Sequence, residues 1–170
     1  MVELYRCSSC GYLHVGPAPE QCPVCGAPGS AFVKFDKLPE LAGTKTLDNL
    51  KAAFAGESQA NRKYTLWRRI AELEGAPQSA LDAFDRAATE QTAHALGHLA
   101  YIGGFGTTAE NLKAAAEGEG YECTEMYPEF AETADAEGLS DLAGYFRVVG
   151  KFESHHRAAY LAALAELEQA

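Results

Sequence analysis

Long apolar runs are missing from this sequence. None of its apolar stretches approaches the ~18 residues that a membrane-spanning helix needs. Residues 1–7 also lack the basic start and apolar stretch of a secretory signal. We therefore expect a cytoplasmic protein that is not embedded in a membrane.

Basic residues are scarce as well. The 170 residues include 14 Lys and Arg against 24 Asp and Glu, which gives a formal net charge of −10. Nucleic-acid binding draws on a basic surface that neutralises phosphates, so the charge argues against nucleic acid as a partner. The acidity has two interpretations: solvated helix faces, or glutamate ligands whose charge a metal cancels. Composition leaves both open.

Cysteine is rare beyond the N-terminal segment, because four of the five cysteines fall within the first 25 residues. They form two matching loops, Cys7-Ser-Ser-Cys10-Gly and Cys22-Pro-Val-Cys25-Gly. Without a secretory signal, this clustering favours a metal site over disulfides. Two such loops supply the four thiolates of a tetrahedral site, which suits iron or zinc.

The segment around these loops is poor in helix formers and rich in Gly, Pro and short β-prone pieces such as residues 32–35. The second loop and the flanking aromatics Tyr5, Tyr12 and Phe32 resemble a short rubredoxin. That resemblance implies one iron that carries single electrons, with zinc as the substitute in a purely structural ribbon. We predict a separate module over residues 1–38, called the cysteine module below, and a linker over residues 36–45.

From Thr46 onward, Ala, Leu and Glu recur with helical periodicity. Long helices joined by short loops favour a four-helix bundle, here residues 39–170. Ser79 and Ser140 are the expected N-caps of the second and fourth helices. The predicted helices cover residues 46–74, 80–102, 108–138, and 140 to the end of the chain.

The third helix contains residues that disturb a regular α-helix. Gly118, Gly120 and Pro128 all lie inside it, and we expect a kink or bulge there.

Acidic and histidine residues recur at matching places along these helices. In di-iron bundles two helices each give one Glu, and two give Glu-x-x-His. The fourth helix contains Glu153 and His156, whose spacing puts both on one face. Each candidate alone is typical of a solvated face or a core histidine, but together they indicate a dinuclear metal site. The other candidates are Glu57 in the first helix, His94 in the second, and Glu119 and Glu122 in the third.

The second helix departs from this rule. Gln91 stands three residues before His94, where a glutamate is expected, and Glu90 precedes it. A neutral amide bridges two cations poorly. Three interpretations follow: Glu90 bridges if a π-bulge turns it toward the metals, Gln91 leaves a site with altered metal content, or the site has lost its chemistry.

Nearly the whole chain resembles a rubrerythrin with the rubredoxin-like module first. The most specific motifs are Phe54-Ala-Gly-Glu57-Ser-Gln-Ala and Gly118-Glu119-Gly-Tyr-Glu122, followed by Glu153-Ser-His-His156 in the fourth helix. The resemblance implies a mainly α protein, with a ferritin-like di-iron bundle after the cysteine module. It also implies an oxidoreductase of oxidative stress, a peroxidase that reduces hydrogen peroxide to water.

The resemblance also implies roles for individual residues. Glu57 and His94 would serve one iron, Glu119 and His156 the other, and Glu153 would bridge them. Glu122 and His94 would alternate as ligands with redox state, and Glu122 or a water would pass protons. Tyr64 and Tyr127 match tyrosines near the metals; their other interpretation is core packing.

Electrons would reach the di-iron site through the cysteine-bound iron. An external reductase is expected, since the sequence contains no dinucleotide-binding fingerprint. The resemblance further suggests a homodimer or higher homo-oligomer with electron transfer across subunits.

Two other functions stay open at this point. One is an iron-handling, ferroxidase-type protein, and the other is a non-enzymatic metal-binding or electron-transfer protein, with Gln91 impairing the site.

Overall fold

A computed structural model describes residues 2–169 of the chain. It is mainly helical, with a three-stranded N-terminal module followed by four long helical segments, as the sequence predicts. Contacts divide the chain into two compact units, the first ending at Gly104 and the second beginning at Phe105. Among the described residues, no helix combines the length and the apolar character needed to cross a membrane.

The cysteine module is a small antiparallel sheet. Its strands are β1 (Leu4–Cys7), β2 (Leu13–Val15) and β3 (Phe32–Lys34), in the order β2-β1-β3. Tyr5 is paired with a residue of each neighbouring strand, which centres β1. Strands this short bury little apolar surface, so the module depends on another constraint, such as a metal, for its stability.

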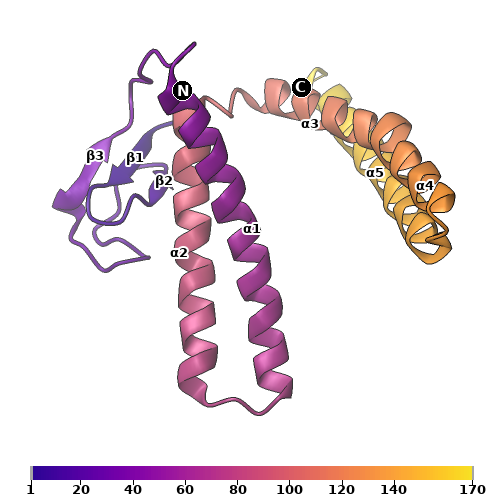
Figure 1. Cartoon of the computed structure of the whole chain (residues 1–170). Helices are drawn as coiled ribbons and strands as arrows, with labels where there is room; N and C mark the ends of the chain where they lie inside the picture. Colours follow the sequence, from indigo (N-terminus) through magenta and orange to yellow (C-terminus); the bar gives the residue numbers. More distant parts are fainter. Residues whose placement is uncertain (1, 170) are drawn as a thin grey trace. The chain divides into compact units, whose positions relative to one another are not determined.

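Two long antiparallel helices follow within the same unit, α1 (Lys45–Leu73) and α2 (Gln78–Ile102) (Figure 1). Thr44 caps α1, because its side chain accepts a hydrogen bond from the amide of Leu47. The predicted cap of α2 is wrong: the helix begins at Gln78 after Pro77, which places Ser79 inside its first turn. Proline has no amide to satisfy and its fixed φ suits a helix start.

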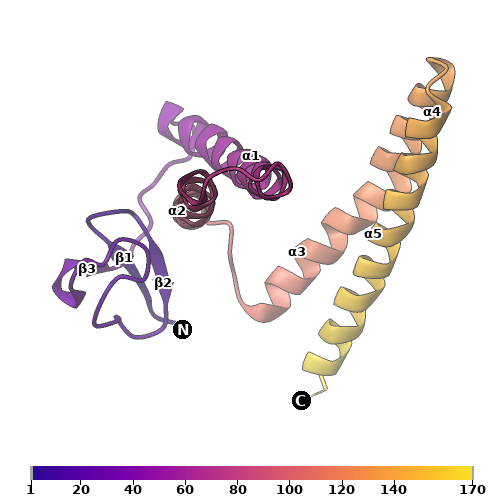
Figure 2. The ribbon, with the colours of Figure 1, turned by 90° about the horizontal axis from the view of Figure 1, so that it is seen from below.

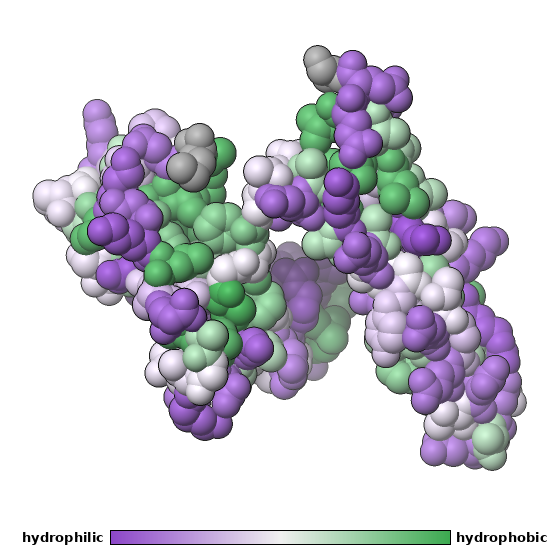
Figure 3. Space-filling model, turned by 90° about the horizontal axis from the view of Figure 1, so that it is seen from above, coloured by the Kyte–Doolittle hydropathy of each residue, from purple (hydrophilic) through white to green (hydrophobic). Residues whose placement is uncertain are grey.

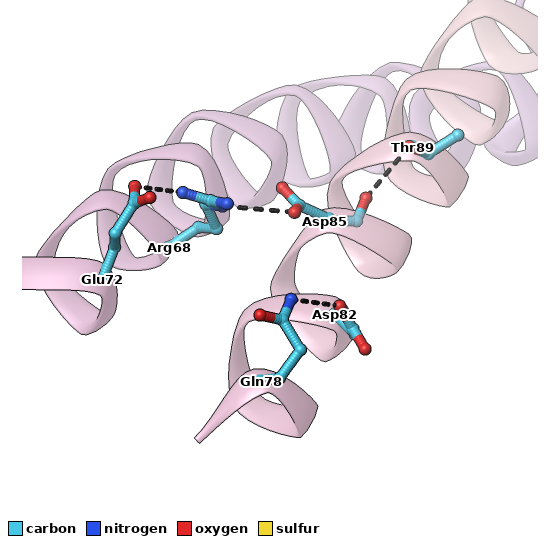
Figure 4. Close-up of polar contacts among 6 residues, drawn as sticks. All are labelled: Arg68, Glu72, Gln78, Asp82, Asp85 and Thr89. Atoms are coloured by element: carbon cyan, nitrogen blue, oxygen red, sulfur yellow. Dashed lines mark hydrogen bonds and ion pairs between the residues drawn. The ribbon is translucent and has the colours of Figure 1, made fainter. Parts of the chain in front are cut away.

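Polar contacts fix the register of these two helices. The buried Asn61 donates through its amide to the carbonyl of Ala88, at 2.7 Å, and to the hydroxyl of Thr92, at 2.8 Å. Nearer the turn, Arg68 contacts Asp85 of α2 at 3.2 Å and also pairs with Glu72 of its own helix (Figure 4). The exposed pairs add little stability, whereas a buried amide must find partners and so specifies the alignment.

The cysteine module packs against α2. The rings of Phe35 and Tyr101 meet edge to face with centroids 4.9 Å apart. A Cβ on Gly97 would stand 3.2 Å from the carbonyl oxygen of Gly11, so two backbones approach closely there. Figures 1 and 2 both show the sheet beside α2 rather than α1. The module and the first two helices therefore form one unit.

The second unit is one interrupted helix packed along an uninterrupted one. Its elements are α3 (Thr108–Tyr121), the π-helical turn η2 (Glu122–Met126), α4 (Tyr127–Ala136) and α5 (Ser140–Leu167). The π-turn confirms the predicted bulge in the third helix. The predicted cap at Ser140 is wrong, because Leu139 precedes the first turn of α5 and no side chain caps that helix.

Close packing joins α4 to α5. The helices meet at Gly150, where a Cβ would stand 2.9 Å from the Cβ of Tyr127. Tyr127, Phe130 and Phe146 form an aromatic cluster beside this contact. Elsewhere each unit exposes large apolar side chains, among them Trp67 and Phe152, and Figure 3 shows apolar patches (green) among hydrophilic residues (purple).

Candidate metal centres

The four predicted cysteines of the module lie together. Their sulfurs are all within 4.8 Å of one another. Cys7 and Cys25 are separated by 3.8 Å between sulfurs, and Cys10 and Cys22 by 3.6 Å. Metal–sulfur bonds of about 2.3 Å in a tetrahedron place the sulfurs about 3.8 Å apart. The spacing therefore fits one tetrahedral ion and is far too long for a disulfide.

The pKa values of these thiols also favour a bound cation. Burial would raise the pKa of Cys7, but hydrogen bonds from the backbone amides of Cys10 and Ser9 outweigh it and lower the pKa to about 7. Burial, with the other sulfurs nearby, raises the pKa of Cys10 to about 12. Four adjacent thiolates repel one another, and a bound cation removes that repulsion. The donor set thus fits a single thiophilic metal.

Three of the predicted helix ligands meet in the second unit. His156 Nδ1 lies 2.7 Å from Glu153 Oε2 on the same helix and 3.5 Å from Glu119 Oε2 on α3. The ligand atoms of all three residues lie within 4.8 Å of one another. The i, i+3 spacing on α5 puts Glu153 and His156 side by side, and the packing of α3 on α5 adds Glu119.

This cluster carries more negative charge than its surroundings balance. Burial, and then the neighbouring Glu153, raise the pKa of Glu119. Glu119 Oε2 is buried and has no hydrogen-bond partner among the described residues. A buried carboxylate oxygen without a hydrogen-bond partner is costly, whereas a divalent cation would both bind it and neutralise it. The cluster fits a carboxylate–histidine metal site.

Glu122 and Tyr127 lie near the same cluster. Glu122 begins the π-turn, one helical turn after Glu119. Burial raises the pKa of Tyr127, with Glu122 and Glu153 the next contributors. Tyr127 thus keeps its phenolic proton and stands close to the candidate ligands, as well as packing in the aromatic cluster.

The first unit contains two further candidates, which also face each other. Glu57 Oε2 on α1 lies 3.9 Å from His94 Nδ1 on α2. Tyr64 packs with Trp67 and Phe84, so its visible role is in the aromatic core of the helix pair.

The positions before His94 differ in their surroundings. Glu90 pairs with Arg86 at 2.9 Å. Gln91 Oε1 is buried and unpaired among the described residues. All residues of α2 are described and the helix contains no π-turn, so the bulge that one interpretation requires is absent. Glu90 is therefore paired with Arg86 of its own helix, whereas the side-chain oxygen of Gln91 has no hydrogen-bond partner among the described residues.

Sequence reasoning missed the contact between Gly11 and Gly97 that seats the cysteine module on α2. The only sequence signal was Gly97 inside a predicted helix, and a single glycine there does not by itself indicate a packing contact.

Fold and donor sets together define a class of protein: a four-cysteine mononuclear metal module joined to helices that carry carboxylate and histidine metal ligands. Residues 48–164 match the rubrerythrin family, and residues 5–33 match its rubredoxin-like domain. The chain belongs to the rubrerythrin family, with the rubredoxin-like domain first.

Individual relatives support both parts of this assignment. The chain is 41% identical to a rubrerythrin of Porphyromonas gingivalis, over 79% of this chain and 74% of that one. It is 36% identical to rubrerythrin-1 of Clostridium acetobutylicum, over 78% and 76%. Reverse rubrerythrin-1 of the same bacterium is 30% identical over 92% of this chain and 93% of its own length, so the likeness extends to the reversed order.

Proposed function

We propose that this protein is a non-haem di-iron peroxidase that reduces hydrogen peroxide to water, with electrons relayed through iron at the four-cysteine site. The observation that carries the proposal is the cluster of Glu119, Glu153 and His156, with a buried carboxylate oxygen that has no hydrogen-bond partner among the described residues. The rubrerythrin family, whose members are generally oxidoreductases, supports the reaction class.

The family's motif positions supply the proposed ligand set. Two irons held there would supply the two electrons and the positive charge that cleavage of the O–O bond requires. Tyr127 holds a proton near the carboxylates, since its pKa is raised. The proposed helix ligands are Glu57, His94, Glu119, Glu122, Glu153 and His156, with Gln91 or Glu90 as the remaining candidate.

The chain's residues prepare the site in three ways. The carboxylates balance the charge of the metals, and burial of Glu119 strengthens that interaction. The α5 backbone holds Glu153 and His156 in contact before any metal binds. In this proposal Glu122 receives or delivers a proton near Tyr127. An external reductase supplies the electrons in this proposal.

Two neighbouring histidines provide a matched test. His156 belongs to the cluster, whereas His155 lies outside it and its ring meets Phe152 edge to face. We expect His156→Ala to lower the rate of peroxide reduction by about a hundredfold, in line with the loss of a metal-site group. His155→Ala should leave that rate unchanged.

The measurement is anaerobic peroxide consumption by reduced, iron-loaded protein, with dissolved oxygen followed in parallel. Consumption without oxygen release identifies reduction to water. Loss of activity in both histidine variants, or in neither, would contradict the assignment. Accumulation of mineral iron during turnover would instead favour the iron-handling alternative, and iron-loaded protein inert to peroxide would favour a binding or electron-transfer role.

A further inference from the structure

Basic side chains of the second unit gather at one groove. Residues 105–170 contain thirteen Asp and Glu but only four Lys and Arg. Three of those four basic residues, Arg147, Lys151 and Arg157, line a groove between α5 and the segment formed by η2 and α4, called the α5 groove below. Among the described residues that line this groove, Glu132 is the single acid. The α5 groove is therefore positively charged within an acidic unit, which favours an anionic ligand.

Two of these three cations are available to a ligand. Arg147 is already paired with Asp135. Lys151 and Arg157 are exposed and have no ion-pair partner among the described residues. An anionic ligand would therefore meet two positive charges that no carboxylate of the described chain balances, and a charge-assisted hydrogen bond to each would be new.

The backbone of α3 holds Arg157 in place. A Cβ on Gly120 would stand 3.1 Å from Nε of Arg157, tighter than ordinary van der Waals contact. The Arg157 side chain therefore lies directly against the α3 backbone, and the absence of a side chain at Gly120 makes room for it. An arginine held in this way loses less conformational freedom when it binds an anion, and its planar fork matches the oxygens of a phosphate.

Apolar and aromatic side chains supply much of the remaining lining. Tyr127 and Phe146, whose ring centroids are 6.3 Å apart, line the α5 groove together with Pro128 and Ala131. The volume of about 600 Å³ lies within the range of small-molecule sites, about 300–1,000 Å³. Apolar and aromatic walls with a few convergent cations are typical of a site for an organic anion rather than for a bare inorganic ion.

We propose that the α5 groove binds a phosphorylated aromatic small molecule of nucleotide size. Its phosphate pairs with Lys151 and Arg157, and its planar ring packs on Tyr127 and Phe146. The three residues of the candidate metal cluster in this unit line no part of the groove, so the site is distinct from that cluster. The inference goes beyond the proposed function and requires neither a metal nor peroxide.

Flavin mononucleotide and riboflavin are a matched pair of probes, because they share one aromatic ring system and differ by the phosphate. Each is titrated into the zinc-loaded full chain, and flavin fluorescence reports binding. We expect flavin mononucleotide to bind at least about tenfold more tightly than riboflavin, the difference that charge-assisted hydrogen bonds to the phosphate make. Equal binding of the two flavins, or no binding at about 1 mM flavin mononucleotide, would overturn the proposal.

Substitution of the basic residues locates the phosphate. Lys151→Gln and Arg157→Gln should each weaken the binding of flavin mononucleotide by about tenfold and leave that of riboflavin unchanged. Lys113→Gln is the matched control, because it removes the same charge from the same unit at a residue that does not line the α5 groove. An equal loss in Lys113→Gln would show a general attraction of charge rather than a site, and would count against the proposal.

A substitution that strengthens binding guards against variants that merely fail to fold. Glu132→Gln removes the one acid of the lining, so flavin mononucleotide should bind about twofold to fivefold more tightly, the scale of an exposed charge interaction. In the wild type, NMR should show the amides of Gly150 and Ser154 shifted by the same ligand. Binding that is no tighter in Glu132→Gln, or amide shifts confined to residues outside the groove, would overturn the assignment.

Discussion

At the residue scale, the cluster in the second unit consists of two carboxylates and one imidazole, Glu119, Glu153 and His156, which together fit a bound cation. Glu119 shows this best, because its pKa is raised by burial and by Glu153, and one of its oxygens has no hydrogen-bond partner among the described residues. A carboxyl whose pKa is raised on folding stabilises the fold below its unfolded pKa. That contribution is lost as the pH rises through the folded pKa.

Glu119→Gln should therefore stabilise the metal-free protein at pH 7. The amide removes the buried charge, and we expect the melting temperature to rise by about 2–4 °C, the shift that a change of about 1 kcal/mol produces in a chain of this size. The gain should shrink at about pH 4, near the unfolded pKa of Glu, where the wild-type carboxyl is also protonated. With iron added the order should reverse. Thermal unfolding by circular dichroism, with and without iron at both pH values, is the measurement. A metal-free Glu119→Gln that melts below the wild type at pH 7 would contradict this account of the site.

Gln91 offers a second prediction at this scale. Its buried oxygen has no partner among the described residues, while Glu90 is paired with Arg86. Gln91→Glu should add a bridging carboxylate and tighten metal binding at the helix site by about tenfold or more. Glu90→Gln should change it little. Iron titration of the metal-free protein measures both, and a stronger effect at Glu90 would assign the bridge to that residue instead.

At the element scale, the π-turn η2 and the close contact at Gly150 arrange the second unit. The extra residue of a π-turn rotates the following helix relative to the preceding one. Glu119 before the turn and Tyr127 after it thereby both approach α5. Gly150 allows that approach, because a Cβ there would stand 2.9 Å from the Cβ of Tyr127.

Gly150→Ala should therefore lower stability. Overpacking of this kind costs about 1–3 kcal/mol. Gly144→Ala on the same helix should be neutral or stabilising by about 0.5–1 kcal/mol, because an added Cβ there has nothing within 4 Å. Denaturant unfolding of both variants compares them, and equal effects would show that the α4–α5 contact at Gly150 is not tight in solution.

The elements also show how far sequence reasoning reaches. The cysteine loops and the long helices could be predicted because spacing and periodicity are local properties of the chain. The bulge in the third helix could be predicted from its glycines and proline. The caps at Ser79 and Ser140 were wrong because Pro77 and Leu139, rather than the serines, precede the first turns. The module's seat on Gly97 was missed because a close approach depends on the partner backbone, which no local pattern contains.

At the scale of the whole molecule, the cysteine module and the first two helices form one unit. Mixing two inactive variants tests the transfer across subunits that the family resemblance suggests. Cys10→Ser removes a proposed ligand of the module, and His94→Ala removes a proposed ligand of the helix site. The mixture should recover peroxide reduction, because an intact module of one chain then serves an intact helix site of another. A mixture that stays inactive would show that transfer does not cross subunits. The homo-oligomer itself stays a prediction, which light scattering tests against the chain mass of 18.2 kDa.

The central claim is a peroxidase with one four-cysteine iron and a di-iron site, and the most direct test is iron content combined with the peroxide response. Anaerobically prepared, iron-reconstituted protein should contain about three irons per chain, one tetrahedral and two in the helix site. Reduction should bleach its red colour, and peroxide should restore the colour without releasing oxygen. One iron per chain, or three irons with no response to peroxide, would contradict the account.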